Sequence, residues 1–503
     1  MAFPEFASRR TPLVLGAALI LLLVGAVALA WGLGRFRRPT RILLVTQALP
    51  QGQTGLEPYQ ERAIGSLVQD ALEVAGGHAV TLVSRLPEGL GSLHGQSNVL
   101  LVLLEPRRSG ESLGLTYRFV RGGDIGKDGA LAWTSRPLDP TAPGQAFEAF
   151  FRGFPLTIKG TPPNLVPNSP GAFWDVIRAG AWRLQNVRME EALALAERTV
   201  RQEPDCATAW ILLGNLRYRW MLNSPAAFRQ EQAETEVHLQ RGLALVPSHP
   251  RGAFLLSLLK ADNGNQREAL DLLMQARRRQ PNNPTLLTGV AYAARGAGLL
   301  PLARKAMDIR DHLAFAEFQP QALDITCLYT GELPRFAASL RDQPGHLRNT
   351  SGVTPFYRGY LALVQGDTTE ARQEFHRATA SINGYPNITR LSRIFELILE
   401  GQRDEAWQQL REYDQERIGM REPDGEFTIR LAEAYAMLGD RASAMEMATR
   451  AFSRGFGCTA WYERSPMLEP LRGLPKWKAL IQHLKERQSL MEDRFPLTLL
   501  DEG

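Results

Sequence analysis

Cysteine is scarce in this chain. Its 503 residues include only Cys206, Cys327 and Cys458, which lie more than 100 residues apart and form no C-x-x-C pair. Zinc sites and disulfide frameworks use closely spaced cysteines, so neither is expected here. We expect three small apolar core residues, and we expect no metal and no cofactor.

Lysine is scarce as well. Lys and Arg together number 58, of which only seven are Lys, and the formal net charge is +5. No cluster of basic residues is interleaved with aromatic residues, which is the pattern of a nucleic-acid-binding surface. The sequence therefore predicts no nucleic-acid partner.

Catalytic motifs are missing too. The chain has no H-E-x-x-H, no G-x-S-x-G, no set of kinase loops and no EF-hand loop, and its eight histidines are scattered. "RGGDIGKDG" resembles a phosphate-binding loop, but Arg121 replaces its first glycine and Asp128 replaces the Ser or Thr that binds magnesium. A hairpin turn explains that segment better. The sequence therefore predicts no catalytic residues and no enzyme.

One long apolar run is present, near the amino terminus. Thr11–Gly34 holds 24 residues without a charge, more than the ~20 that a membrane-spanning helix needs. We predict a short tail at 1–12 and a transmembrane anchor at 13–34. A cleaved signal peptide is the rival interpretation, because Ala28-Leu29-Ala30 resembles a cleavage site. Arginines flank both ends of the run, so charge alone leaves the orientation open.

Residues 40–156 alternate between strand and helix patterns. "RILLVTQ", "AVTLVS", "NVLLVLLE", "LGLTYRFVRG" and "ALAWTSRPL" read as strands, and "NVLLVLLE" is apolar enough to be buried on both faces. Residues 56–77 carry apolar side chains at helical spacing, and "PGQAFEAFFRGF" closes the segment as a helix. This order predicts a small α/β domain with a mixed sheet.

The same segment resembles a known family. The order "RILLVTQ … LVQDALE … VTLVSR … NVLLVLLEPRRSGESLGLTYRFV … LAWTSRPL" is similar to the TolB-type domain of membrane-anchored bacterial regulators of the acid-sensing, winged-helix kind. In those regulators a DNA-binding domain precedes the membrane helix. Here twelve residues precede the predicted span, so DNA binding is not carried over.

From about Phe173 the chain becomes helical and repeats every 34 residues. Gly264 and Ala269 recur as Gly298 and Ala303, and "AWILLGNLRY" contains the W-x-x-L-G opening that resembles a tetratricopeptide helix. Glycines are expected to end the first helix of five repeats in the left-handed conformation: Gly264, Gly298, Gly366, Gly401 and Gly439. Small residues where helices cross, and bulky ones such as Leu273 and Phe375 between repeats, complete the pattern.

These signals divide the chain. We predict a linker at 157–172 and about eight repeats over 173–456, with the fifth and seventh degenerate. The expected fold class is mainly α: a tetratricopeptide superhelix preceded by one transmembrane helix and the small mixed-sheet domain at 40–156. The first helix of each repeat lines the concave groove of such a superhelix. On this register the predicted partner-groove residues are Asn215, Tyr218, Arg219, Tyr292, Arg295 and Tyr360.

The carboxyl-terminal segment resembles the end of bacterial tetratricopeptide arrays. Gly455-Phe456, Cys458 and Trp461-Tyr462 precede the run "SPMLEPLRGLPKWKALIQHL". Prolines there break the helical period, so the apolar residues between them are expected to fold over the last repeat. We predict a capping segment at 457–490 and a tail at 491–503, with Cys458 as a core residue and not a nucleophile.

Together these patterns predict a membrane-anchored scaffold that binds an unidentified protein partner through its repeats. The alternative is a membrane-anchored sensor whose α/β domain binds a small ligand or partner. The expected location is the inner membrane, as a single-pass protein. The resemblance to TolB-type regulators implies a periplasmic body, and a cytoplasmic body stays open.

Overall fold

A computed structural model describes residues 40–46, 54–156, 158, 164–223, 228–316, 324–340, 352–381, 386–420 and 425–501. By its internal contacts the chain divides into Met1–Thr40 and a second compact unit, Arg41–Gly503. The predicted tail at 1–12 and the predicted anchor at 13–34 lie outside the described residues. Everything below concerns the second unit.

The predicted location in the inner membrane is wrong for the part of the chain that the structure describes. A membrane-spanning helix needs about 20 predominantly apolar residues. No helix in the described ranges is both long enough and apolar enough to meet that requirement, because the repeat helices carry charged residues along their exposed sides.

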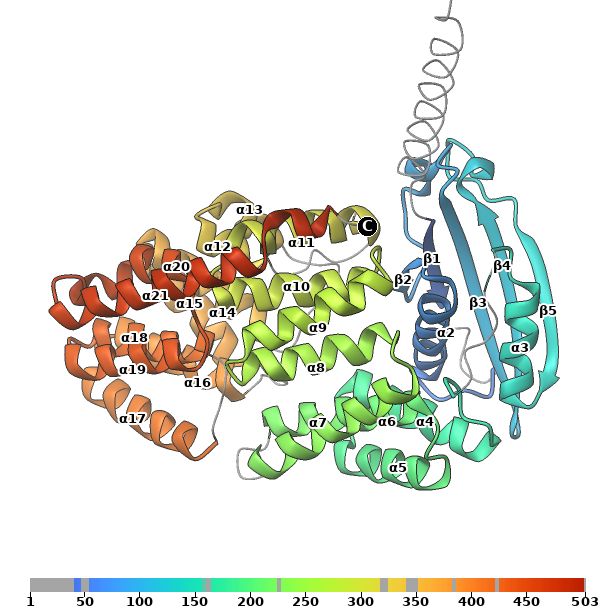
Figure 1. The fold of residues 1–503 in the computed structure, drawn as a ribbon, viewed down its shortest axis with the longest axis horizontal. Coiled ribbons are helices and arrows are strands. Elements are labelled where there is room, and N and C mark those ends of the chain that lie inside the picture. Colours follow the sequence, from blue (N-terminus) through green and yellow to red (C-terminus); the bar gives the residue numbers. More distant parts are fainter. Residues whose placement is uncertain are drawn as a thin grey trace, which may run out of the picture. The chain divides into compact units, whose positions relative to one another are not determined.

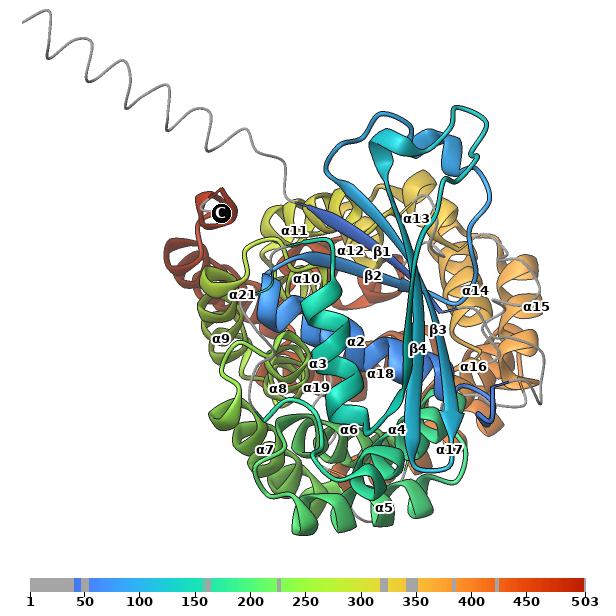
Figure 2. The same ribbon diagram turned by 90° about the vertical axis from the view of Figure 1, so that its right-hand side faces the viewer.

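A five-stranded mixed sheet begins the described chain, as the sequence predicted. Its strands are β1 (Arg41–Thr46), β2 (Ala79–Val83), β3 (Val99–Ser109), β4 (Ser112–Arg121) and β5 (Thr134–Thr141), in the spatial order β2-β1-β3-β4-β5. β1 pairs in parallel with β2 and β3, whereas β4 pairs antiparallel with β3 and β5. Figure 2 shows β3 and β4 side by side.

Both faces of the central strands are buried. Ile42 and Leu44 pack against α2 (Gln60–Gly76) and α3 (Pro143–Gly153), while Leu43 and Val45 pack on the opposite face with Leu93 and its neighbours. Consecutive strand residues point to opposite faces, so a continuous apolar run fits a strand covered twice. The prediction that "NVLLVLLE" is buried on both faces is confirmed.

Helical hairpins make up most of the remaining chain. In the described ranges, sixteen helices from α4 to α19 follow one another as eight pairs. They are α4 (Pro170–Gln185) with α5 (Met189–Gln202), α6 (Ala207–Asn223) with α7 (Phe228–Leu245), α8 (Pro250–Asp262) with α9 (Gln266–Arg279), α10 (Pro284–Ala297) with α11 (Leu300–Leu313), α12 (Ile325–Thr330) with α13 (Leu333–Ser339), α14 (Val353–Gln365) with α15 (Thr368–Thr379), α16 (Pro386–Leu399) with α17 (Arg403–Met420), and α18 (Gly425–Met437) with α19 (Arg441–Ser453). The fifth pair, which the sequence predicted to be degenerate, is the shortest.

The turn and crossing residues act as predicted. All five glycines expected to end the first helices have positive φ, from 77° at Gly401 to 86° at Gly298. A Cβ on Gly289 would lie 2.7 Å from a methyl carbon of Leu273, so a larger residue there would force that side chain to move. The 34-residue register therefore follows from close helix packing.

The carboxyl-terminal segment covers the last hairpin. It comprises α20 (Thr459–Arg464), a 3₁₀ turn at Pro466–Leu471, α21 (Pro475–Arg494) and a 3₁₀ turn at Leu497–Leu500. Cys458 is fully buried in the same core cluster as residues of α18 and α19. The chain then returns to earlier repeats, where Arg494 pairs with Asp271 of α9 and Phe495 joins the core of α10 and α11.

The sheet layer and the repeats are packed together within this unit. Phe173 and Ile177 of α4 belong to the same apolar cluster as α2 and the sheet. The Trp174 indole donates a hydrogen bond of 3.1 Å to the Glu111 carbonyl. Figure 1 shows α2 on the side of the sheet that faces the repeat helices. This placement leaves cavities between α2, β2 and the repeat helices.

The domain boundaries at 40–156 and 173–456 stay a prediction.

Candidate functional site

Three cavities lie where α2 and β2 face the first helices of the repeats. The largest, here called the groove cavity, has a volume of about 410 Å³ and is lined mainly by α6 and α8. The second, here called the arginine cavity, has about 270 Å³ and lies between α2, β2 and the helices α4, α8, α10 and α11. A third space of about 50 Å³ lies beneath them. Arg183 and Arg251 line all three, so the cavities adjoin.

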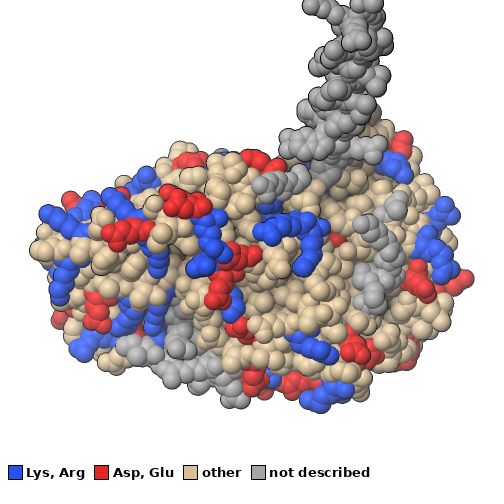
Figure 3. Space-filling model, viewed as in Figure 1, with Lys and Arg blue, Asp and Glu red and all other residues tan. Residues whose placement is uncertain are grey.

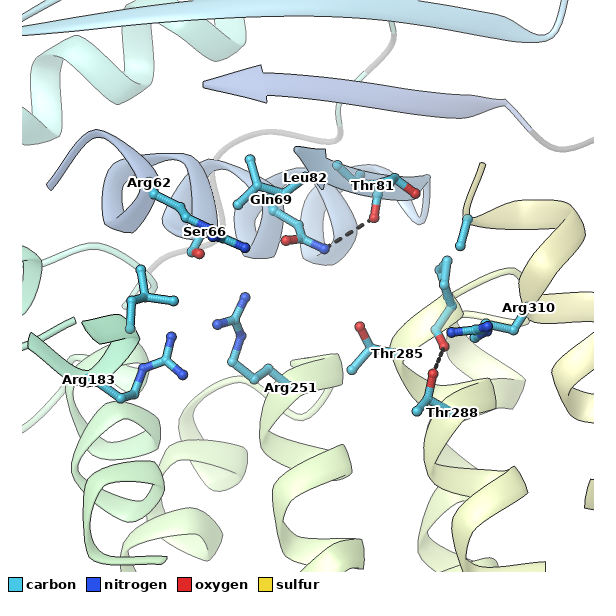
Figure 4. Close-up of a pocket in the computed structure, with 14 residues that line it drawn as sticks. Arg62, Ser66, Gln69, Thr81, Leu82, Arg183, Arg251, Thr285, Thr288 and Arg310 are labelled. Atoms are coloured by element: carbon cyan, nitrogen blue, oxygen red, sulfur yellow. Dashed lines mark hydrogen bonds between the residues drawn. The ribbon is translucent and has the colours of Figure 1, made fainter. Parts of the chain in front are cut away.

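The arginine cavity is strongly positive. Arg62, Arg183, Arg251 and Arg310 line it, and no described Asp or Glu does. The four side chains come from α2, α4, α8 and α11, and Figure 4 shows them around one space. By contrast, basic and acidic side chains are interspersed over the face of the molecule that Figure 3 shows. The positive charge is thus concentrated inside this cavity.

Arg183 is the most confined of the four arginines. Its side chain lies near the end of α4, the residue is 9% exposed, and no described carboxylate forms an ion pair with it. Burial, together with the neighbouring charges of Arg251 and Arg219, lowers the pKa of Arg183 to about 9, and the charge of Asp70 offsets only part of this effect. A guanidinium held in this way keeps its charge at neutral pH at a cost in free energy.

The other arginines of the cavity differ in whether a carboxylate balances their charge. Arg251 forms an ion pair of 3.1 Å with Asp70 of α2, and Arg310 pairs with Asp311. Arg62 forms no ion pair with any described residue. Asp70 is the only acidic residue that lines any of the three cavities, among the described residues. Two of the arginines that line the arginine cavity, Arg62 and Arg183, therefore have no carboxylate partner among the described residues.

Two further titratable groups are buried beside Asp70. Burial, together with the charge of Asp70, raises the pKa of the Glu73 carboxyl to about 8, so it is largely protonated at neutral pH. Burial lowers the pKa of His249 to about 4, and neither ring nitrogen has a hydrogen-bond partner among the described residues. At neutral pH Glu73 therefore adds little negative charge and His249 adds no positive charge.

Three of the six predicted groove residues lie together. Asn215, Tyr218 and Arg219 all line the groove cavity, beside Phe254 and Leu258 of α8. The Tyr218 hydroxyl donates a hydrogen bond to the Asp262 carboxylate, and the Arg219 guanidinium contacts the Arg183 carbonyl at 3.5 Å. These contacts fix the two side chains at the wall of the cavity.

The other three predicted groove residues lie elsewhere, in contacts within the protein. The Tyr292 hydroxyl donates to Asp262 at 2.6 Å, which ties α10 to α8. Arg295 forms two hydrogen bonds with the Glu426 carboxylate, at 2.9 and 2.8 Å, and is 8% exposed. Tyr360 is fully buried. The structure does not bring these three residues to the groove cavity.

Tyr360 belongs to a buried polar cluster around Arg430 and Glu433 of α18. The Arg430 guanidinium lies 4.1 Å from the centre of the Tyr360 ring and donates a hydrogen bond of 2.8 Å to the Tyr329 hydroxyl. Glu433 accepts hydrogen bonds from Arg430, Tyr360 and the Trp461 indole. This cluster joins α12, α14, α18 and α20, and Tyr360 packs within it.

Sequence reasoning missed Arg62, Arg183, Arg251 and Arg310. Arg251 and its partner Asp70 are 181 residues apart, and no local pattern links them. One signal was available for Arg183. It lies near the end of α4, the first helix of its hairpin, as Arg219 does near the end of α6.

The three thiols have no access to solvent. Cys206, Cys327 and Cys458 are free and buried, which confirms the prediction of core residues. Burial raises the pKa of each to about 12, so none is a thiolate at neutral pH. In the described ranges, no three His, Cys, Asp or Glu residues are grouped so that they could hold a metal ion.

Comparison with known proteins identifies one segment of the chain. Residues 183–220, from the end of α4 into α6, match the tetratricopeptide repeat family. The chain therefore contains a tetratricopeptide repeat, as the W-x-x-L-G motif at Trp210 predicted. No curated protein sequence matches the chain significantly.

Two solved structures are distantly similar. The crystal structure of yeast Tom70 is 12% identical over 67% of this chain and 71% of that chain, with a TM-score of 0.34. The tetratricopeptide domain of P58(IPK) is 12% identical over 64% of this chain and 99% of that chain, with a TM-score of 0.19. Superpositions this loose carry no argument about arrangement or function.

Proposed function

We propose that this chain is a protein-interaction scaffold whose repeats hold a protein partner at the groove cavity. The observation that carries the proposal is the composition of that cavity. Asn215, Tyr218 and Arg219 of α6 face it together with Phe254 and Leu258 of α8. Arginine and aromatic side chains beside apolar ones are the residues that contribute most to protein interfaces.

The tetratricopeptide match supports the same proposal, because it ends at Trp220 and so includes the three groove residues. Arrays of stacked helical hairpins present extended surfaces to partners. Within this proposal residues 40–156 form a TolB-type domain of a bacterial protein, on the resemblance of their strand and helix order.

Charge reversal in the groove cavity tests the proposal. The full chain would carry an affinity tag, and its partners would be cross-linked in cells, purified and quantified for the wild type, for Arg219→Glu and for Arg241→Glu. Arg241 is the matched control, since it lies on α7, the second helix of the same hairpin, with a half-exposed side chain paired to Asp205. Equal melting temperatures would establish that both variants fold.

We expect the partner of the wild type to be lost from Arg219→Glu and kept by Arg241→Glu. Reversing one charge at the centre of an interface costs several kcal/mol. A partner that both variants retain at equal yield would refute binding at the groove cavity. The absence of any partner enriched over an untagged control would refute the scaffold function itself.

A sensor is the second candidate function, and the arginine cavity favours it. That cavity is bounded by α2 and β2 on one side and by repeat helices on the other. A small ligand bound there would contact both parts of the unit at once.

A further inference from the structure

The arginine cavity holds more positive charge than its surroundings neutralise. Arg62 and Arg183 have no ion-pair partner among the described residues, and Arg251 shares its charge with Asp70 alone. Glu73 is buried near Asp70, and its raised pKa leaves it mostly uncharged at neutral pH. Like charges held together away from water raise the free energy of the protein unless an anion joins them.

The side chains are aimed into the space rather than away from it. In Figure 4, Arg62 reaches down from α2 while Arg183 and Arg251 reach up from α4 and α8. Arg310 approaches the same space from α11. A buried guanidinium offers up to five N–H donors in one plane, so three or four of them around one space can surround a multiply charged oxyanion.

Neutral donors and helix ends add to this arrangement. Ser66 of α2 and Thr285 of α10 line the cavity, and neither hydroxyl forms a hydrogen bond with another described residue. Arg251 and Thr285 occupy the first turns of α8 and α10, where the helix dipole is positive. These helix ends add positive potential beside Arg183, a buried guanidinium that no described carboxylate balances.

We propose that the arginine cavity is a binding site for a small molecule that carries a multiply charged oxyanion, either a phosphate-type group or a polycarboxylate. Arg183, Arg251 and Arg62 bind the anion, with Arg310 at the edge and Ser66 and Thr285 as neutral donors. This inference deepens the sensor candidate and is independent of the scaffold proposal.

The dimensions of the site favour a small ligand. A volume of about 270 Å³ is at the lower end of ligand pockets, and α2, β2 and the repeat helices enclose it from opposite sides. We therefore expect a ligand small enough to fit within the arginine cavity itself.

Titration of the full chain with pyrophosphate and with citrate tests the proposal. Binding would be measured by calorimetry and by the shift in melting temperature, with potassium chloride holding the ionic strength constant. We expect saturable binding of at least one anion, and the anion that binds more tightly assigns the group. No saturable binding of either anion would overturn the proposal.

Arg183→Gln is the decisive variant, and Arg278→Gln is its control. Arg278 is an exposed residue of α9 that forms no hydrogen bond or ion pair with another described residue and does not line the cavity, so its variant makes the same chemical change away from the site. Arg183→Gln should weaken anion binding about tenfold or more, the effect of losing one charge-assisted hydrogen bond. Arg278→Gln should bind as the wild type does.

The unliganded variants separate a binding role from a structural one. Without an anion, Arg183→Gln should melt at or above the temperature of the wild type, because it removes a buried charge that no described carboxylate balances. A large drop in that temperature would contradict this account. Arg62→Gln, a change at a partly exposed residue of α2, should weaken anion binding to a similar extent. Unchanged binding by either cavity variant would overturn the proposal, whatever the outcome for the scaffold.

Discussion

Replacing Arg430 by methionine should destabilise the carboxyl-terminal half of the repeats severely. Arg430 is 2% exposed, lies over the Tyr360 ring and donates hydrogen bonds to Tyr329 and to Glu433 at 2.8 and 3.3 Å. Methionine fills a similar volume but leaves the Glu433 carboxylate buried without a positive partner. Breaking a buried ion pair from one side costs about 3–5 kcal/mol.

An exposed ion pair in the same part of the chain provides the control for the loss of stability. Arg390 of α16 pairs with Glu416 of α17, and both side chains are almost half exposed. Arg390→Met should cost less than about 1 kcal/mol, because water screens such pairs. The two variants make the same chemical change at a buried and at an exposed site.

Urea unfolding of the full chain, read together with hydrogen exchange of α18 and α20, measures the difference. Exchange in these two helices should rise in Arg430→Met and stay unchanged in Arg390→Met. Adding Glu433→Gln to Arg430→Met should recover about 1–2 kcal/mol, because a neutral amide needs no counter-charge. If Arg430→Met costs no more than Arg390→Met, the buried cluster does not hold these helices together and the assignment of Tyr360 to packing fails.

Three further predictions concern buried groups elsewhere. Burial raises the folded-state pKa of Glu73 to about 8 from its usual 4.5, so the free energy of unfolding should fall by up to about 1.4 kcal/mol per pH unit as pH rises between those values. Glu73→Gln should remove that slope in urea unfolding at pH 5 to 8.5, and an unchanged slope would contradict it. Gly298→Ala should lower the free energy of unfolding by about 2 kcal/mol or more in the same assay, because φ is 86° and a Cβ there would meet the Gly457 carbonyl oxygen. A loss below about 0.5 kcal/mol, roughly that of a surface substitution, would refute this contact. Cys458 should resist a thiol reagent in the folded chain, since it is buried and burial raises its pKa to about 12. Cys458→Ala should lower the free energy of unfolding by about 1 kcal/mol without weakening partner binding. Rapid labelling, or loss of the partner at an unchanged melting temperature, would show that Cys458 is a functional thiol.

The repeats could be predicted from the sequence because their signals are local. A glycine ends a first helix in the left-handed conformation, and small residues allow one hairpin to cross the next, so each signal lies within about 34 residues. The strands of the sheet layer and their sequence along the chain followed in the same way from apolar runs and turn residues, whereas their spatial order did not. Both predictions needed only the identity of residues that lie close together in the sequence.

The site could be predicted only in part, because its residues meet across long sequence separations. The repeat register placed Asn215, Tyr218 and Arg219 on the inner side of the array, where the structure finds them beside a cavity. The same register gave no warning that Arg295 would pair with Glu426, 131 residues later, and so be buried. The arginine cavity depends on how α2 lies against α4 and α8, and no spacing in the sequence encodes that arrangement.

A photo-cross-linking amino acid placed at one position at a time tests the central claim most directly. The claim is that the groove cavity holds a protein partner. In one variant the cross-linking amino acid replaces Tyr218, which lines the cavity. In the control variant it replaces Trp407, an aromatic residue of α17 that is 38% exposed. Irradiated cells should yield a specific cross-linked partner from position 218 and not from position 407. A partner captured at position 407 alone, or equally at both positions, would contradict the claim.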